Sequence, residues 1–145
     1  MSVSIEQIRP ELTWQLRRDV LYPDEMKHNM GMEEDEYGVH FGAFKDNKLV
    51  GIVSLFQSGT GFQFRKLAID PSVQKMGIGN SLLQCITSFA RQEGGTRIWC
   101  NARLSATGFY LKANFVQTGK FFSKNGYDYE IMEKAITPSP NPLIY

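Results

Sequence analysis

The sequence predicts a mixed α/β fold with a mostly antiparallel sheet and one parallel strand pair. Two tight-turn signals, Asp46-Asn47 and Asn125-Gly126, each lie between segments typical of strands, as in antiparallel hairpins. Residues 62–101 have the pattern of a strand, a glycine-containing loop, a helix and a second strand, and strands joined by a crossover helix pair in parallel. With 145 residues, 42% of them hydrophobic, the chain has the size and apolar content of one domain.

Apolar patterns place the individual elements along the chain. Strands are expected at residues 3–9, 39–44, 49–56, 62–69, 96–101, 115–121 and 127–134. Helices are expected at residues 11–21, from residue 78 to the stop at Gly94-Gly95, and at 106–112, with Asn114 in the left-handed conformation at the last helix end. Residues 24–37, called the connector below, are polar and acidic. They form either a solvated linker or the mouth of a site for a cationic substrate.

The strand that ends at Ile69 contains an irregularity. Phe62 and Phe64 are in phase with each other, as are Leu67 and Ile69, but the three-residue step between the pairs would put them on opposite faces. One extra residue near Arg65-Lys66 would restore a single apolar face, which predicts a β-bulge. The alternative is a strand buried on both faces, which needs no bulge.

Composition excludes several classes of protein. The net charge of +1 gives no reason to expect a nucleic-acid or anionic-membrane partner. The sequence contains no long apolar run and begins with no signal-peptide pattern. Cys85 and Cys100 have no metal-type spacing and are interpreted as small core residues, so neither a metal site nor a disulfide framework is expected. These features favour a cytoplasmic protein with reduced thiols.

The loop at residues 74–79, Gln-Lys-Met-Gly-Ile-Gly, joins a strand stopped by Pro71 to the longest predicted helix. Glycine lets a ligand approach the backbone, and the unpaired N–H groups and positive dipole end of a helix favour phosphate. A Walker loop would need a lysine where Asn80 stands, and a dinucleotide fingerprint would need a glycine at Leu82. The alternative is a tight turn without a ligand.

The remaining pattern, Gln-x-x-Gly-x-Gly after a strand ending in Asp-Pro, resembles the pyrophosphate loop of the GNAT superfamily of N-acetyltransferases. A second match, residues 101–103 with 108–115, is similar to the family's Phe-Tyr-x-Lys-x-Gly-Phe helix, with Asn114 in place of glycine. A third, residues 126–134, resembles the closing strand of small bacterial members, although Asp128-Tyr129 replaces the Pro-His pair of some of them. The resemblance covers residues 1–136 as a single acetyltransferase domain and leaves residues 137–145 as a proline-rich tail.

This resemblance implies a GNAT fold in which the parallel strands splay apart and helices cover both faces of the sheet. It also implies that acetyl-CoA is bound, with pantetheine along the strand end and pyrophosphate on the loop. The expected cofactor contacts are Leu67, Ala68, Ile69, Gln74, Lys75, Met76, Gly77, Ile78, Gly79, Asn80 and Asn101.

The expected activity is N-acyl transfer, in which acetyl-CoA donates an acetyl group to a primary amine by direct attack in a ternary complex. Tyr110 is the expected general acid, and its neighbour Phe109 is expected in the core. Three residues of the connector are candidates for the substrate site or general base: Glu25, His28 and Glu33.

The acceptor is expected to be a small-molecule or peptide amine, and the apolar end of the tail suggests a homodimer. His40, on a strand beside Phe41, is interpreted as structural. The alternative function is a non-catalytic acyl-CoA sensor or interaction module on the same fold.

Overall fold

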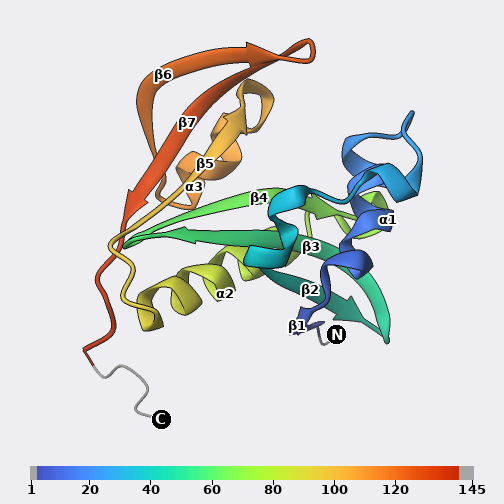
Figure 1. The fold of residues 1–145 in the computed structure, drawn as a ribbon, viewed down its shortest axis with the longest axis horizontal. Coiled ribbons are helices and arrows are strands. Elements are labelled where there is room, and N and C mark those ends of the chain that lie inside the picture. Colours follow the sequence, from blue (N-terminus) through green and yellow to red (C-terminus); the bar gives the residue numbers. More distant parts are fainter. Residues whose placement is uncertain (1–2, 141–145) are drawn as a thin grey trace. The chain divides into compact units, whose positions relative to one another are not determined.

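The computed structural model describes residues 3–140, which form one seven-stranded sheet in the order β1-β2-β3-β4-β5-β7-β6 (Figure 1). The strands are β1 (Val3–Ile8), β2 (Val39–Lys45), β3 (Lys48–Ser58), β4 (Gly61–Ile69), β5 (Arg97–Arg103), β6 (Val116–Lys124) and β7 (Tyr127–Ala135). The α-helices are α1 (Trp14–Leu16), α2 (Ile78–Gln92) and α3 (Thr107–Lys112). Short 3₁₀ or π turns are η1 (Pro10–Thr13), η2 (Arg17–Leu21), η3 (Lys27–Asn29), η4 (Glu33–Tyr37), η5 (Pro71–Val73) and η6 (Leu104–Ala106).

The chain divides into two compact units. The N-terminal unit consists of Met1–Phe56 and Phe64–Ile86, and the C-terminal unit of Gln57–Gln63 and Thr87–Tyr145. Across residues 3–140, no helix has the length and apolar character needed to cross a membrane.

The N-terminal unit contains the first predicted hairpin. β2 pairs antiparallel with both β1 and β3, and its register with β3 shifts between Ala43 and Phe44. Asp46 and Asn47 turn the chain with φ values of +52° and +63°. Two successive left-handed residues are what a two-residue type I′ hairpin turn requires, so the turn signal in the sequence is confirmed.

Helices cover both faces of the sheet in this unit. Leu16 of α1 packs with Ile52 and Ala68, which fixes the face of β3 and β4 that α1 covers. Gly51 points the other way because successive strand residues face opposite sides. A Cβ atom at Gly51 would lie 3.0–3.2 Å from Ile69, Leu82 and Ile78, so α2 packs directly on this backbone. The predicted two-sided cover is therefore confirmed in this unit.

The predicted helix at residues 11–21 is a continuous helical segment, but its hydrogen bonding changes along its length. Pro10 opens it in η1, α1 is a single α-helical turn, and η2 is a π-helical turn. The backbone N–H of Tyr22 accordingly donates to the carbonyl oxygens of both Arg17, at 3.2 Å, and Arg18, at 3.1 Å. π turns inside helices are rare and often lie at functional sites.

β4 has the predicted irregularity at the predicted place. Lys66 has a φ of +59°, the left-handed conformation that long side chains seldom adopt in a strand, and this irregular point at Arg65-Lys66 is called the β4 bulge below. The strand is nevertheless also buried on both faces near its end, because Ala68 is buried against Leu16 while Ile69 packs toward α2. The two interpretations of the sequence therefore both hold in part.

The C-terminal unit contains the predicted parallel pair and the second hairpin. Gly61–Gln63 of β4 pairs in parallel with Arg97–Trp99 of β5, and β5 continues antiparallel to β7. β6 and β7 form the long hairpin at the edge of the sheet (Figure 1). Asn125 and Gly126 turn it with φ values of +53° and +81°, again a type I′ turn.

α3 ends as predicted, with Asn114 in the left-handed conformation at a φ of +69°. Beyond β7, residues 137–140 have no regular structure, and hydrogen bonds to Arg91 of α2 fix the backbone of this segment. The Arg91 side chain donates to the Thr137 carbonyl at 2.7 Å, and the Ser139 N–H donates to the Arg91 carbonyl at 2.9 Å. The apolar end of the tail, on which the homodimer prediction rests, lies outside the described residues.

Candidate functional site

The glycine loop is held at both ends by its own side chains. Asp70 ends β4 and accepts hydrogen bonds from the Ser72 backbone N–H at 2.9 Å and hydroxyl at 2.8 Å. Those hydrogen bonds hold the pKa of Asp70 below its ordinary value. The Gln74 side-chain amide reaches back to donate to the Ile69 carbonyl at 3.0 Å. Gln74, a residue of the pyrophosphate pattern, therefore fixes the loop against the end of the strand.

The centre of the loop presents bare backbone to solvent. Lys75 and Gly77 have φ values of +66° and +83°, and no atom lies within 4 Å of the position that a Gly77 Cβ would take. Ile78 is buried and anchors the start of α2, while the Ser81 N–H closes the first helical turn on the Gly77 carbonyl at 3.0 Å. The N–H groups that precede Ser81 lie at the positive end of a 15-residue helix.

The remaining predicted cofactor contacts of this unit flank the loop. Met76 and Asn80 are exposed and Gly79 is half-buried. At the end of β4, Ala68 is buried and Leu67 and Ile69 are half-buried. The unit thus brings the strand end and the loop together, as the resemblance implies, and their arrangement suits an anionic ligand with an extended arm.

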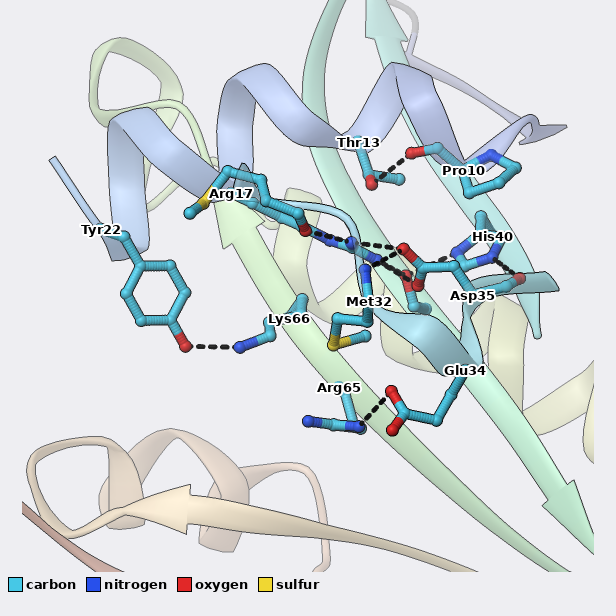
Figure 2. A network of polar contacts seen from close by, with 12 residues as sticks. Pro10, Thr13, Arg17, Tyr22, Met32, Glu34, Asp35, His40, Arg65 and Lys66 are labelled. Atoms are coloured by element: carbon cyan, nitrogen blue, oxygen red, sulfur yellow. Dashed lines mark hydrogen bonds and ion pairs between the residues drawn. The ribbon is translucent and has the colours of Figure 1, made fainter. Parts of the chain in front are cut away.

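A buried polar network fixes the connector beside this strand. Arg17 has no exposed surface, and its guanidinium donates to Asp35 through two hydrogen bonds of 2.8 and 2.9 Å and to the Met30 carbonyl at 2.9 Å (Figure 2). Burial alone would raise the pKa of Asp35, but the hydrogen bonds from Arg17 and from the Met32 N–H outweigh it and hold that pKa below its ordinary value. Sequence reasoning missed this pair.

His40 belongs to the same network. Its Nε2 lies 2.9 Å from the Asp35 carbonyl oxygen and its Nδ1 lies 2.7 Å from the Ser54 hydroxyl, which also accepts from Arg17 at 3.0 Å. A carbonyl only accepts, so Nε2 carries the proton, and in the neutral ring Nδ1 accepts from Ser54. His40 is therefore a structural residue, as interpreted from the sequence.

The connector residues proposed for the acceptor side are all at the surface. Glu25, His28 and Glu33 are exposed, whereas Asp35 is buried in the ion pair. The acidic segment therefore has two roles, because one carboxylate is structural and the others face solvent.

In the C-terminal unit, the two adjacent aromatic residues of α3 differ in burial. Tyr110 is buried and Phe109 is exposed, so the expectation that Phe109 lies in the core was wrong. The Tyr110 ring packs edge-on against Phe109 and Phe115, with centroids 5.1 and 5.8 Å away. Burial, with a smaller contribution from Cys100, raises the pKa of Tyr110 well above its ordinary value. The phenol therefore remains protonated at neutral pH.

Asn101, Cys100 and Glu130 are three further residues of this unit whose burial bears on the candidate site. Asn101, a predicted cofactor contact, is exposed on β5. Cys100 is buried, and burial raises the pKa of its thiol to about 12. Glu130 is buried on β7 and accepts from the Gln117 amide at 2.8 Å and the Gly119 N–H at 2.9 Å, which holds the irregular register of β6. Sequence reasoning did not single out Glu130.

No group of three or more His, Cys, Asp and Glu side chains within residues 3–140 is arranged to hold a metal ion.

Residues 6–136 match the model of the family described as "Acetyltransferase (GNAT) domain". The uncharacterized N-acetyltransferase YitI of Bacillus subtilis (strain 168) is 24% identical over 147 residues, which cover 94% of this chain and 99% of that protein.

Solved structures of acetyltransferases share the fold. An IAA acetyltransferase from Bacillus cereus ATCC 14579 is 19% identical with a TM-score of 0.75, covering 93% of this chain and all of that one. An aminoglycoside 6′-N-acetyltransferase complexed with coenzyme A is 18% identical with a TM-score of 0.77, and the match covers 94% of this chain and 99% of that one. The ribosomal-protein-S18-alanine N-acetyltransferase of Escherichia coli is 16% identical with a TM-score of 0.75, and the match covers 99% of this chain and all of that one.

Proposed function

Because the chain belongs to the GNAT acetyltransferase family, we propose that it transfers an acetyl group from acetyl-CoA to a primary amine by direct attack in a ternary complex. The observation that carries the proposal is the glycine loop. Its exposed backbone has two left-handed residues, Lys75 and Gly77, and open space at Gly77 directly before α2. Such a loop suits the pyrophosphate of a nucleotide-linked donor.

In the proposed reaction, the neutral amine attacks the thioester carbonyl carbon, a C–N bond forms, and the C–S bond breaks. Backbone N–H groups of residues 74–80 hold the pyrophosphate, and the backbone of Leu67, Ala68 and Ile69 holds the pantetheine arm. A backbone N–H at the β4 bulge stabilises the developing oxyanion. Tyr110 donates its proton to the departing sulfur, since its raised pKa keeps the phenol protonated.

The acceptor side is assigned to three exposed residues of the connector. Glu25, His28 and Glu33 are the candidates that take the ammonium proton, directly or through water. Two relatives of this fold are named for an aminoglycoside and for an alanine of a ribosomal protein. Both names support an amine acceptor and leave the choice between a small molecule and a peptide to experiment.

Two measurements test the proposal. Isothermal titration with acetyl-CoA should give a dissociation constant in the micromolar range. A panel of amines, aminoglycosides and peptide N-termini, followed by release of the CoA thiol, should then identify an acceptor. Absence of binding at millimolar acetyl-CoA would contradict the proposal. Tight binding without thiol release for any amine would favour the alternative, a non-catalytic acyl-CoA-binding module.

A further inference from the structure

Two consecutive basic residues at the β4 bulge contact the segment that precedes and includes the connector (Figure 2). The Lys66 ammonium donates a hydrogen bond to the Tyr22 hydroxyl and lies 4.5 Å from the centre of the Tyr22 ring. The Arg65 guanidinium lies 3.5 Å from the Glu34 carboxylate. The bulge is therefore attached to both ends of the segment that carries the proposed acceptor residues.

The backbone conformation of Lys66 explains why the contact of its side chain with Tyr22 is important for the bulge. Its φ of +59° is unfavourable for a residue with a Cβ and needs support from its surroundings. A bulge also takes one residue out of the regular alternation of the ladder. The direction of the next N–H group, that of Leu67, consequently depends on whether Lys66 keeps this conformation.

Tyr22 is well placed to supply that support because it is itself fixed. Its backbone N–H closes the π turn on Arg17 and Arg18, and its carbonyl accepts from the Glu25 N–H at 3.0 Å. The Arg17 side chain is in turn fixed in the buried pair with Asp35. A continuous series of contacts therefore runs from the buried network through the Tyr22 ring to the bulge.

We propose that Tyr22 is a positioning residue for acyl transfer: through Lys66 it holds the bulge in the conformation that presents the Leu67 N–H to the thioester carbonyl. This inference rests on the proposed function, in which a bulge N–H stabilises the oxyanion. A donor fixed before the reaction stabilises developing charge without reorganising during it. Tyr22 touches no reacting atom in this scheme. It acts through Lys66 on the contact between the Leu67 N–H and the carbonyl group of the donor.

The neighbouring ion pair provides an internal control. The Arg65 and Glu34 side chains are 33% and 58% exposed, and ion pairs that are exposed to this extent contribute little to stability. Glu34→Gln therefore removes a contact to the same bulge without disturbing the Lys66–Tyr22 hydrogen bond. Tyr37→Phe removes a phenol hydroxyl from a connector residue that is 79% exposed, which controls for the chemistry of the substitution.

The experiment compares two ligands that differ only in the carbonyl group. Acetyl-CoA carries the thioester carbonyl, whereas S-ethyl-CoA has a methylene in its place. Isothermal titration of both ligands is carried out on the wild type, Tyr22→Phe, Lys66→Met, the double variant and the two controls. Circular dichroism and the melting temperature establish that each variant is folded, and Lys66→Met provides the same test if Tyr22→Phe does not fold.

Tyr22→Phe and Lys66→Met should each weaken acetyl-CoA binding about fivefold to tenfold more than they weaken S-ethyl-CoA binding, the value of one hydrogen bond to the carbonyl group. The double variant should show no further loss, since both substitutions break one contact. If folded variants keep the wild-type ratio of the two affinities, the positioning role is wrong while the proposed function stands. If the wild type binds neither ligand, the proposed function fails and this inference with it.

Discussion

Arg17 and Asp35 form a buried, two-pronged ion pair, with Nη1 2.8 Å from Oδ2 and Nη2 2.9 Å from Oδ1. The pair joins the π turn η2 to the connector turn η4. The same guanidinium donates to Ser54 on β3, so three elements far apart in the sequence meet at one charge. A buried arginine that loses its carboxylate has no adequate replacement for it, because desolvation of the remaining charge is not compensated.

The first prediction therefore concerns the stability of this pair. Asp35→Asn keeps the shape of the side chain but leaves the Arg17 charge uncompensated. It should lower the free energy of unfolding by about 3–5 kcal/mol, as measured by urea denaturation at pH 7. Asp24→Asn, at an exposed position of the same segment, is the control and should change it by less than about 0.5 kcal/mol. Equal effects of the two substitutions would show that the pair does not support the fold.

The second prediction is that the contribution of Asp35 to the free energy of unfolding depends on pH. The folded-state pKa of Asp35 is below its unfolded value, so its contribution is complete above about pH 4 and is lost as pH falls through the folded pKa. The stability difference between wild type and Asp35→Asn should shrink progressively below about pH 4. A difference that stays constant down to pH 2.5 would mean that the pKa of Asp35 is the same in the folded and unfolded states.

The sequence predicted those features that depend on neighbouring residues. The two hairpin turns, the left-handed Asn114 and the irregularity at Lys66 each follow from a short local pattern. The Arg17–Asp35 pair lies 18 residues apart along the chain, and no local pattern connects the two. The sequence places Arg17 in the predicted helix at residues 11–21 and Asp35 in the connector, and only the packing of η2 against the connector brings them together.

The aromatic residues of α3 illustrate a second limit. Helical periodicity assigns a buried face when several turns repeat the pattern, but α3 has only six residues. Phe109 and Tyr110 are adjacent, so one of them must face away, and hydrophobicity favours burying phenylalanine. Packing against Phe115 buries Tyr110 instead. Intrinsic hydrophobicity is therefore a poor guide where a single turn offers two aromatic residues.

The third prediction tests the glycine loop. Gly77→Asp puts a carboxylate and a Cβ where backbone must approach the pyrophosphate; the space around Gly77 is open, but its φ of +83° makes the substitution a strained one that needs a matched control. Acetyl-CoA affinity should fall by at least about a hundredfold, since like charges repel and an N–H contact is lost. Isothermal titration measures the change.

Gly126→Asp is the matched control for that substitution. Gly126 has a φ of +81° against +83° at Gly77, and it also has no atom within 4 Å of its Cβ position. The two variants therefore carry a similar backbone strain, while Gly126 lies in the β6–β7 turn. Equal acetyl-CoA affinities in both variants, with native circular dichroism, would place the phosphate site elsewhere.

The fourth prediction concerns the two thiols. Burial raises the pKa of both thiols, and it raises that of Cys100 to about 12, so almost no Cys100 thiolate is present at pH 8. In Cys85→Ala, the remaining Cys100 should react with a disulfide reagent roughly a thousandfold more slowly than the same protein in urea. Rapid reaction in the folded state would show that β5 opens. Slow reaction would also make Cys85→Ala a low-background form of the protein for the thiol-release assay.

The final prediction concerns Tyr110. A departing thiolate has a conjugate pKa of about 8.5 against about 10 for a free phenol. Burial raises the pKa of Tyr110 further, which keeps the phenol protonated at neutral pH and at the same time makes it a weaker acid toward the sulfur. Tyr110→Phe removes only the hydroxyl and keeps the edge-on packing with Phe109 and Phe115. With the amine found by the panel, kcat should fall by roughly 10²–10³-fold, while the melting temperature and acetyl-CoA affinity change little.

Tyr127→Phe, at an exposed tyrosine of the same unit, is the control and should leave kcat unchanged. The pH dependence of the rate adds a second readout, because an acid with a strongly raised pKa should sustain the wild-type rate well above pH 10, where a free phenol would ionise. A lower melting temperature with an unchanged rate per folded molecule would instead identify Tyr110 as a core residue. The proton would then reach the sulfur from water, and catalysis would depend on how the protein positions the two substrates.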